Sequence, residues 1–298
     1  KQKTAYEIRL SLVGSEMCIR DRKTPVAGDT ITMPNGTAKP WRDATAGDDG
    51  WLALRGGSYA VWKFESPEDR VMILDAAGHG NVLINGELRT GDPYENGYVK
   101  LPVLIRKGEN ELLFRAGRGR IRAKLVQPAA DIYVEPGDMT MPDLIVGKEG
   151  FGAAIVVNAT REPLKNWVIG AASGQSWSLL ERIPDMPPLS TRKVKVQLGT
   201  APRTPGEIPV SIGVGPPFDQ ANDGEPRQFG APVQIKIAVR NPTDKHKRTF
   251  ISSIDGSVQY YSVVPAATGA VHDESVKPGI VLSLHGASVE ATNQAGAY

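Results

Sequence analysis

Short apolar segments separated by turn residues run through almost the whole of this sequence. The chain has 298 residues, and its 32 Gly and 23 Pro are spread along it rather than gathered in one linker. Glycine and proline destabilise helix interiors and favour tight turns, so this distribution predicts many short strands and excludes a single helical bundle. A chain of this length usually holds two or three domains. We therefore predict a mainly β protein made of consecutive β-sandwich domains.

The first predicted domain covers residues 23–128, where strand alternation is clearest. Strands are predicted at Tyr59–Phe64, Arg70–Leu74, Asn81–Ile84, Tyr98–Ile105 and Glu111–Phe114. Asn85-Gly86 directly follows one of them, and both residues tolerate the positive φ angles that a two-residue hairpin turn requires. Antiparallel strands joined in this way predict a β-sandwich.

Three phrases of this domain, Val82–Glu87, Gly91–Tyr94 and Gly108–Asn110, resemble jelly-roll domains of the galactose-binding-like type. Many members of that family bind sugars, and others are accessory domains, so the fold does not choose between these roles. Aromatic rings in exposed loops are suited to stacking on sugar rings. The candidate carbohydrate-binding residues, all in Gly-rich or Pro-rich loops, are Trp41, Trp51 and Tyr94.

A basic stripe closes the same domain, because Arg118, Arg120, Arg122 and Lys124 occupy alternate positions. Alternate residues of a strand share one face, which would place these cations in a row. Such a row fits phosphate or an acidic sugar, and a solvated strand face is the more general explanation. Nucleic acid is not an expected partner, because acidic and basic residues balance once residues 1–22 are set aside.

The second predicted domain covers residues 129–240. Its strands are predicted at Asp131–Val134, Ala153–Asn158, Trp167–Ala171, Arg192–Leu198, Glu207–Val214 and Val233–Val239, each bounded by Pro or Gly. This block resembles an immunoglobulin-like sandwich. The basic, polar segment Arg240–Arg248 that follows it is predicted to be a linker.

The last predicted domain covers residues 241–298. Two segments, Arg248–Ile254 and Val258–Pro265, flank Asp255-Gly256 and predict a hairpin. The continuous apolar run Gly279–Leu284 is typical of a strand buried on both faces of a parallel sheet. His285-Gly286 ends this run, and the Ala-rich segment after it suits a helix.

This order of hairpin, buried strand, His-Gly and helix resembles the start of the α/β-hydrolase domain in prolyl oligopeptidase-like serine hydrolases. The resemblance implies an oxyanion-hole loop at Gly286, Ala287 and Ser288, with His285 structural rather than catalytic. In that family the nucleophile, acid and histidine follow this strand, so we expect all three beyond Tyr298. The expected parent enzyme acts on a peptide or ester, and the chain as given is expected to be inactive. The alternative is a secreted carbohydrate-binding or adhesion protein.

A second serine motif is a candidate nucleophile that we do not favour. Gly174–Ser178 approximates the G-x-S-x-G nucleophile elbow, with Ser176 as the nucleophile, but Ser178 replaces the last glycine. Pro184 and Pro187 follow where the elbow needs a helix. A turn on a β-sandwich is the preferred interpretation.

Residues 1–22 are expected to be an artefact rather than part of the fold. Glu16–Asp21 is what GAG ATG TGT ATA AGA GAC encodes, a string that resembles a transposase sequencing adapter. The only cysteine, Cys18, lies in this segment, so no disulfide or thiolate chemistry is expected. The absence of cysteine from the remainder suits a secreted or periplasmic bacterial protein.

Neither a metal nor a cofactor is expected. The four histidines are widely separated and match no metal-ligand spacing. No apolar run approaches the roughly 20 residues of a membrane-spanning helix, so no membrane span is expected in this portion.

Overall fold

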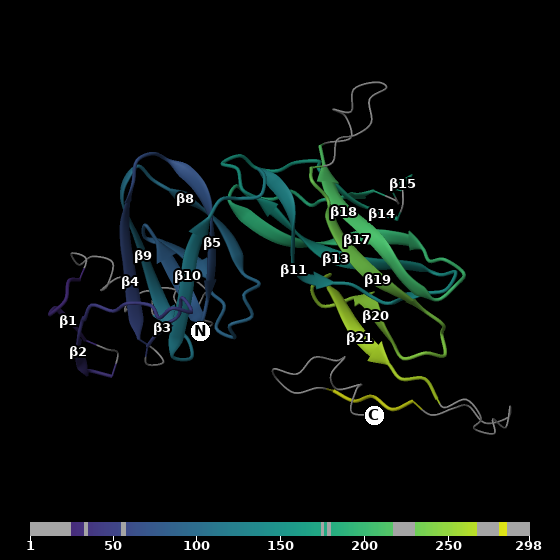
Figure 1. Cartoon of the computed structure of the whole chain (residues 1–298), viewed down its shortest axis with the longest axis horizontal. Coiled ribbons are helices and arrows are strands. Elements are labelled where there is room, and N and C mark those ends of the chain that lie inside the picture. The colour runs from purple at the N-terminus through teal and green to yellow at the C-terminus, as the bar shows by residue number, and fades with distance from the viewer. Residues whose placement is uncertain are drawn as a thin grey trace, which may run out of the picture. The chain divides into compact units, whose positions relative to one another are not determined.

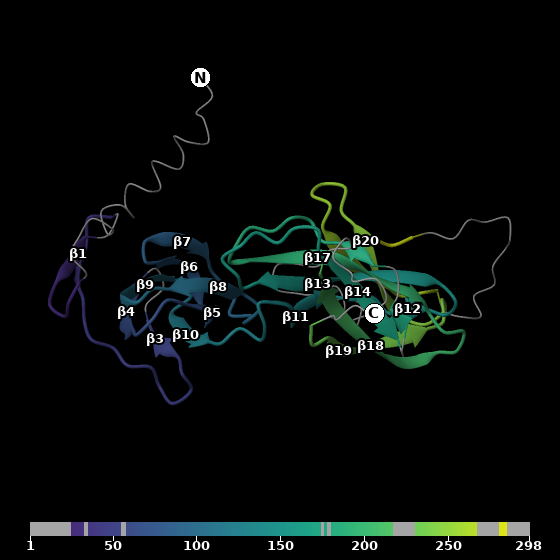
Figure 2. The ribbon, with the colours of Figure 1, turned by 90° about the horizontal axis from the view of Figure 1, so that it is seen from above.

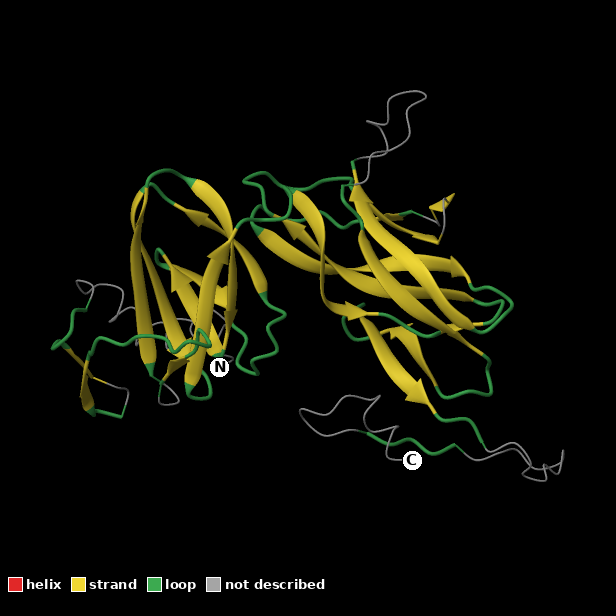
Figure 3. Ribbon diagram, viewed as in Figure 1, coloured by secondary structure: helices red, strands yellow, loops and turns green. Residues whose placement is uncertain are grey.

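The computed structural model describes residues 25–32, 35–54, 58–173, 176–177, 180–216, 230–266 and 280–284. Every regular element in these ranges is a β-strand, and the prediction of a mainly β, sandwich-type fold is confirmed (Figures 1, 2 and 3). The described part of the chain has no helix that is long and apolar enough to cross a membrane. The chain divides into two compact units, residues 1–68, 75–99 and 106–124, and residues 69–74, 100–105 and 125–298.

The region from residue 52 to residue 126 forms two antiparallel four-stranded sheets. One has the order β4-β9-β6-β7, from strands β4 (Tyr59–Ser66), β9 (Gly108–Ala116), β6 (His79–Ile84) and β7 (Glu87–Thr90). The other has the order β3-β10-β5-β8, from β3 (Leu52–Ala53), β10 (Arg120–Val126), β5 (Arg70–Ala77) and β8 (Lys100–Ile105). A separate two-stranded sheet pairs β1 (Thr30–Thr32) with β2 (Ala38–Pro40).

Strand β10 shows how alternation places the basic residues. Ile121 is buried in the core, whereas Arg120 and Lys124 are exposed on the other face of the strand. The strand begins at Arg120, so Arg118 lies in the preceding turn and the predicted alternation starts two residues too early. The reason is Gly119, which has a φ of 115° and is not extended.

The predicted Asn85-Gly86 hairpin is confirmed between β6 and β7, with φ angles of 49° and 86° at its two turn residues. Asn110, which is buried, fixes this turn from the neighbouring strand. Its Oδ1 accepts hydrogen bonds from Asn85 Nδ2 at 2.8 Å and from the Arg106 amide at 2.9 Å. Its Nδ2 donates to the carbonyls of Arg106 and Gly108. One buried amide therefore satisfies the polar groups of two adjacent loops.

The second unit contains a three-stranded sheet, a larger sheet and a hairpin. The three-stranded sheet has the order β11-β13-β17, from β11 (Ile132–Thr140), β13 (Glu149–Asn158) and β17 (Ser190–Thr200). The larger sheet has the order β12-β19-β18-β14-β15, from β12 (Leu144–Ile145), β19 (Val233–Arg240), β18 (Gly206–Gly215), β14 (Val168–Ser173) and β15 (Ser176–Trp177), with β16 (Glu181–Arg182) also paired to β14. All six strands predicted for this block are present.

The core of the second unit is aliphatic. Its central members include Val156, Ile169, Val196 and Ile212, all fully buried. Burial of such side chains is worth roughly 1.5–3 kcal/mol each, which makes this packing the main source of the unit's stability.

The predicted hairpin around Asp255-Gly256 is confirmed by β20 (His246–Ile251) and β21 (Val258–Val263). The prediction of a linker over Arg240–Arg248 is wrong at its end, because β20 already begins at His246 and that side chain is buried. The alternation was obscured because His246 and Lys247 are both polar, while only one of them faces inward.

The buried parallel strand predicted at Gly279–Leu284 is not found. Residues 280–284 form no strand, and the side chains of Ile280, Val281, Leu282 and Leu284 are between 84% and 93% exposed. A strand buried on both faces needs neighbouring strands for its backbone and covering elements for its side chains. None of the described residues provides that cover for this run. The segments 1–22 and 289–298 lie outside the described residues.

Candidate functional site

Two of the three predicted sugar-binding aromatics lie on one surface of the first unit. Trp51 precedes β3, and Tyr94 lies in the loop between β7 and β8. Trp41 is elsewhere, since its backbone hydrogen-bonds to Asp29 and Gly28 beside the β1–β2 sheet. Within the described part of the chain, no hydrogen bond or ring contact joins Trp41 to the other two.

Trp51 is held by its loop and by the sheet. Its amide donates to Asp49 Oδ1 at 3.0 Å, and its carbonyl accepts from the Gly47 amide at 2.9 Å. Since Leu52 pairs with Ile121 in the β3–β10 ladder, Trp51 lies next to Arg122 on the outer face. The guanidinium carbons of Arg120 and Arg122 lie 4.2 Å and 5.2 Å from the centroid of the Trp51 ring, within cation–π distance.

Arg120 connects Trp51 to the second loop. Its Nε donates to Glu95 Oε2 at 2.7 Å, and its Nη2 donates to the same oxygen. The hydrogen bond that Arg120 donates to Glu95 raises the pKa of Arg120, so this side chain is a permanent cation. Trp51, Arg120 and Glu95 are therefore linked although they come from three separate segments.

Tyr94 stands beside Glu95 and is 54% exposed. The guanidinium carbon of Arg118 lies 4.5 Å from the centroid of its ring. The loop is fixed from below by Asp92, whose buried carboxylate accepts hydrogen bonds from the amides of Asn96 at 3.2 Å and Gly97 at 2.6 Å. The aromatic residue is thus exposed while its loop is well anchored.

We call this surface the aromatic–arginine face and define it by Trp51, Tyr94, Glu95, Arg118, Arg120 and Arg122. The expectation of open aromatic rings needs correction, because guanidinium groups cover part of both rings. In the sequence, the loop aromatics and the basic stripe are separate features. The structure joins them into one surface that combines apolar rings with several N–H donors.

A buried histidine lies under the same loop. His79 is 1% exposed, packs edge-on against Phe114 at 5.4 Å between ring centroids, and has no hydrogen-bond partner on either ring nitrogen. Burial lowers the pKa of His79 to about 4, and the nearby Asp92 carboxylate only partly opposes this effect. His79 is therefore neutral at pH 7. The burial of His79 was not predictable from the sequence, because its β6 neighbours Gly80 and Asn81 interrupt the apolar pattern.

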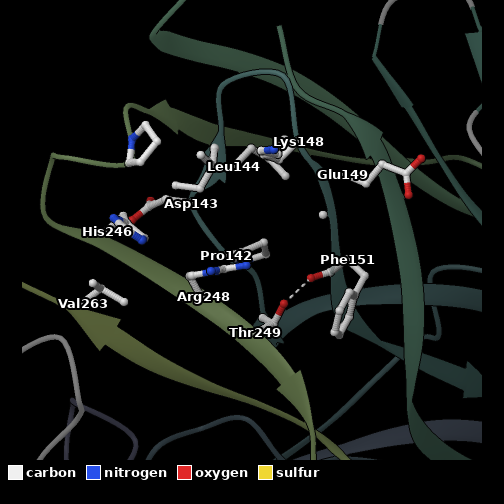
Figure 4. Close-up of a pocket in the computed structure, with 13 residues that line it drawn as sticks. Pro142, Asp143, Leu144, Lys148, Glu149, Phe151, His246, Arg248, Thr249 and Val263 are labelled. Atoms are coloured by element: carbon white, nitrogen blue, oxygen red, sulfur yellow. Dashed lines mark hydrogen bonds between the residues drawn. The ribbon is translucent and has the colours of Figure 1, made fainter. Parts of the chain in front are cut away.

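The second unit contains a pocket of about 520 Å³, a size typical of small-molecule sites (Figure 4). It lies between the segment leading into β13 and the β20–β21 hairpin. Its lining residues are Pro142, Asp143, Leu144, Ile145, Lys148, Glu149, Gly150, Phe151, Pro242, His246, Arg248, Thr249 and Val263. Three hydrogen bonds attach the hairpin here. The Lys247 amide donates to Asp143 Oδ2 at 2.7 Å, the Asp143 amide donates to the Lys247 carbonyl at 2.8 Å, and Thr249 Oγ1 donates to the Phe151 carbonyl at 2.5 Å.

The lining of the pocket contains no serine or cysteine that could act as a nucleophile beside His246. His246 Nδ1 lies 2.7 Å from the Asp244 carbonyl and donates to it, because a carbonyl oxygen can only accept. The only hydroxyl in the lining belongs to Thr249, and it already donates to a carbonyl. Two acidic and two basic side chains balance each other, so the pocket favours no ligand charge. No group of three metal-ligating side chains occurs in the described ranges.

The predicted oxyanion-hole residues Gly286, Ala287 and Ser288, and the structural His285, lie outside the described residues. Ser176, the nucleophile of the rejected motif, lies on the short strand β15, which pairs antiparallel with β14. A nucleophile elbow requires a turn from strand to helix, so this hairpin placement agrees with the rejection.

No protein-family model matches the chain, and no curated protein matches it. Among solved structures it is similar to a GH2 β-galacturonidase from Eisenbergiella tayi bound to glycerol, at 11% identity and a TM-score of 0.31, over 81% of this chain and 46% of that one. It is also similar to a β-D-mannosidase from Dictyoglomus thermophilum, at 10% identity and a TM-score of 0.30, over 78% and 37%. The chain thus spans less than half the length of these structures. Because the TM-scores are low, we take no function from these likenesses.

Proposed function

We propose that this chain is the carbohydrate-binding part of an exported bacterial protein and that it holds sugar at the aromatic–arginine face. The observation that supports this proposal is the Arg120 guanidinium, which contacts the Trp51 ring and binds Glu95 next to Tyr94. This contact gathers two loop aromatics into one surface.

The chemistry of the surface suits a sugar. The half-exposed Tyr94 and the partly buried Trp51 offer apolar contact to the C–H groups of a pyranose ring. The guanidinium groups supply N–H donors for the oxygen atoms of a sugar. Arg120 and Arg122 project from a strand rather than from a loop, so their positions are set by the sheet.

The proposal is tested by calorimetric titration of the full chain with galactotriose and with trigalacturonate. Saturable binding of at least one trisaccharide is expected, and Trp51→Ala is expected to weaken it at least about tenfold. Phe250→Ala removes a half-exposed aromatic from the second unit and is the matched control. Thermal unfolding of each variant shows whether its fold is retained. Absence of binding to either sugar, or equal binding by Trp51→Ala, would contradict the proposal.

A second candidate function is the N-terminal part of a serine hydrolase of the prolyl oligopeptidase-like type. Two features favour it, the confirmed β20–β21 hairpin and the exposed apolar run at residues 280–284, which precedes His285-Gly286. An exposed run of large aliphatic side chains is unfavourable in water, so it fits a segment covered by further structure.

This candidate is tested by reading the coding sequence downstream of codon 298. A frame that continues into G-x-S-x-G, then Asp, then His would support it, and a frame without these residues would exclude it. The chain as given should show no turnover of p-nitrophenyl esters, and Ser176→Ala should behave like the unmodified chain. Ester turnover that disappears in Ser176→Ala would revive the rejected motif.

A further inference from the structure

We infer that the ligand of the aromatic–arginine face is an acidic carbohydrate, one that carries carboxylates or sulfate esters. This inference rests on the proposed function and specifies the class of sugar. It depends on how the three arginines lie on the aromatic rings and on which of them remain without an acidic partner.

The stacking geometry directs the arginines toward an anion. A guanidinium that lies over an aromatic ring keeps its N–H groups near its own plane, so the edge of the group stays available for hydrogen bonds. The guanidinium carbon of Arg118 lies over the Tyr94 ring, 4.5 Å from its centroid, and that of Arg122 lies 5.2 Å from the Trp51 centroid. Such an edge matches the two oxygens of a carboxylate or two oxygens of a sulfate. A neutral hydroxyl would leave most of this donor capacity unused.

The charges of the face are only partly neutralised. Glu95 binds Arg120, and Asp49 adds a weaker attraction to the same side chain. Arg118 and Arg122 make no ion pair with any described residue. An anionic ligand therefore has two guanidinium groups for which it need not compete with a carboxylate of the protein.

Arg122 is in addition partly withdrawn from water. Its Nε is buried and has no hydrogen-bond partner, and its alkyl part packs 3.9 Å from the position of a Cβ on Gly50. A desolvated cation gains more from an added anion than a fully hydrated one, because the cost of removing water has already been met. This makes Arg122 the residue at which an acidic ligand gains most.

Lys124, the next cation on β10, lies outside the aromatic–arginine face. Lys124 binds Asp75, with 3.2 Å between Nζ and Oδ2, so its charge is already compensated. From Arg118 to Lys124, the arginines that make no ion pair with a described residue are thus the two that also contact an aromatic ring. This coincidence of ring contact and free charge distinguishes an acidic-sugar site from a general basic stripe.

The test uses the full chain and three matched trisaccharides in calorimetric titrations: trigalacturonate, galactotriose as its uncharged counterpart, and a sulfated galactotriose. Trigalacturonate or the sulfated sugar is expected to bind at least about tenfold more tightly than galactotriose. Arg118→Gln and Arg122→Gln are each expected to weaken binding of the acidic sugar by about threefold to tenfold. Arg115→Gln, which removes one exposed charge from β9, should change it by less than about twofold. Raising the ionic strength should weaken the binding of the acidic trisaccharides but not that of galactotriose.

The outcomes separate this inference from the proposed function. If charged and uncharged trisaccharides bind equally well and Trp51→Ala abolishes both, the sugar-binding proposal stands and the acidic specificity is overturned. Binding of no trisaccharide would overturn both. Equally tight binding of a single-stranded oligonucleotide, weakened by the same arginine variants, would show an unspecific anion surface and also overturn the inference. A preference between carboxylate and sulfate identifies which acidic group is recognised, and either preference supports the inference. Since Arg118 is exposed, its variant retains the fold and keeps the test decisive if Arg122→Gln unfolds.

Discussion

The guanidinium carbon of Arg120 lies 4.2 Å from the centroid of the Trp51 ring, and the same guanidinium donates to Glu95. Arg120 belongs to β10, Trp51 to the loop before β3, and Glu95 to the loop after β7. A single side chain on a strand therefore fixes two loops at once. This relationship links the two loops within the aromatic–arginine face, and it determines how substitutions there should behave.

Glu95→Gln is predicted to tighten the binding of trigalacturonate by about twofold to fivefold. The substitution removes the carboxylate that occupies Arg120 and also removes its repulsion of an acidic ligand. Glu109→Gln, which breaks the exposed pair with Lys63 on another sheet, should leave the affinity unchanged. Calorimetric titration measures both variants. Weaker binding by Glu95→Gln would mean that the carboxylate itself contacts the ligand.

Gly78→Ala is predicted to destabilise the chain by at least about 3 kcal/mol. Gly78 has a φ of 84°, and a Cβ there would lie 2.1 Å from the Arg120 carbonyl oxygen and 3.2 Å from Trp51 Cζ3. Gly108→Ala is the matched control, since Gly108 has a φ of 88° but nothing within 4 Å of the added Cβ. Gly108→Ala should lower the free energy of unfolding only by the backbone strain, about 1–2 kcal/mol. Urea unfolding compares the two, and equal losses would refute the predicted clash.

Acidification is predicted to destabilise the chain through His79. Its pKa is lowered from 6.5 to about 4 in the folded protein, so the unfolded chain takes up the proton first as the pH falls. The resulting loss of stability begins near pH 6.5, reaches about 2 kcal/mol at pH 5 and is complete below pH 4.

His79→Leu isolates this contribution from that of the carboxylates. Neither ring nitrogen has a hydrogen-bond partner, so the substitution leaves no polar group unsatisfied, and its cost at pH 7 should be small. The free energy of unfolding of the parent should fall by about 2 kcal/mol more between pH 7 and pH 5 than that of His79→Leu. Parallel pH profiles in urea unfolding would show that His79 is not responsible.

Asp143→Ala is predicted to loosen the β20–β21 hairpin. The Asp143 carboxylate accepts a hydrogen bond from the Lys247 amide, and its loss should cost about 1–2 kcal/mol locally. Amide hydrogen exchange in His246–Ile251 should become about fivefold to thirtyfold faster. Glu207→Ala, which removes an exposed partner of Lys236, should not change exchange in the hairpin. Unchanged protection in Asp143→Ala would mean that the remaining hydrogen bonds, from the Asp143 amide to the Lys247 carbonyl and from Thr249 to the Phe151 carbonyl, hold the hairpin without the carboxylate.

The strands were predictable because their signal is local. Alternation and turn residues located β4, β13 and β18 to within a few residues, and Asn85-Gly86 located its hairpin. The aromatic residues and the basic stripe of the candidate site were also visible in the sequence. Their combination was not, because Trp51 meets Arg122 only through the pairing of β3 with β10.

The run at residues 280–284 shows that apolar composition alone does not predict burial. Its apolar sequence has the composition of a buried strand, yet in the structure it is exposed and unpaired with any described strand. Burial depends on which elements cover a segment, and composition does not supply them. The burial of His79 and Asn110 was equally invisible, since both depend on neighbours distant in the sequence.

The most direct test of the central claim is a two-dimensional NMR titration of the labelled full chain with trigalacturonate. The account predicts that shifts concentrate on the Trp51 indole N–H, the Tyr94 loop and the Nε groups of Arg118 and Arg122. Shifts concentrated around His246 and Arg248 would place the ligand in the pocket of the second unit instead. That result, or no shifts at saturating ligand, would contradict an acidic-carbohydrate site on the aromatic–arginine face.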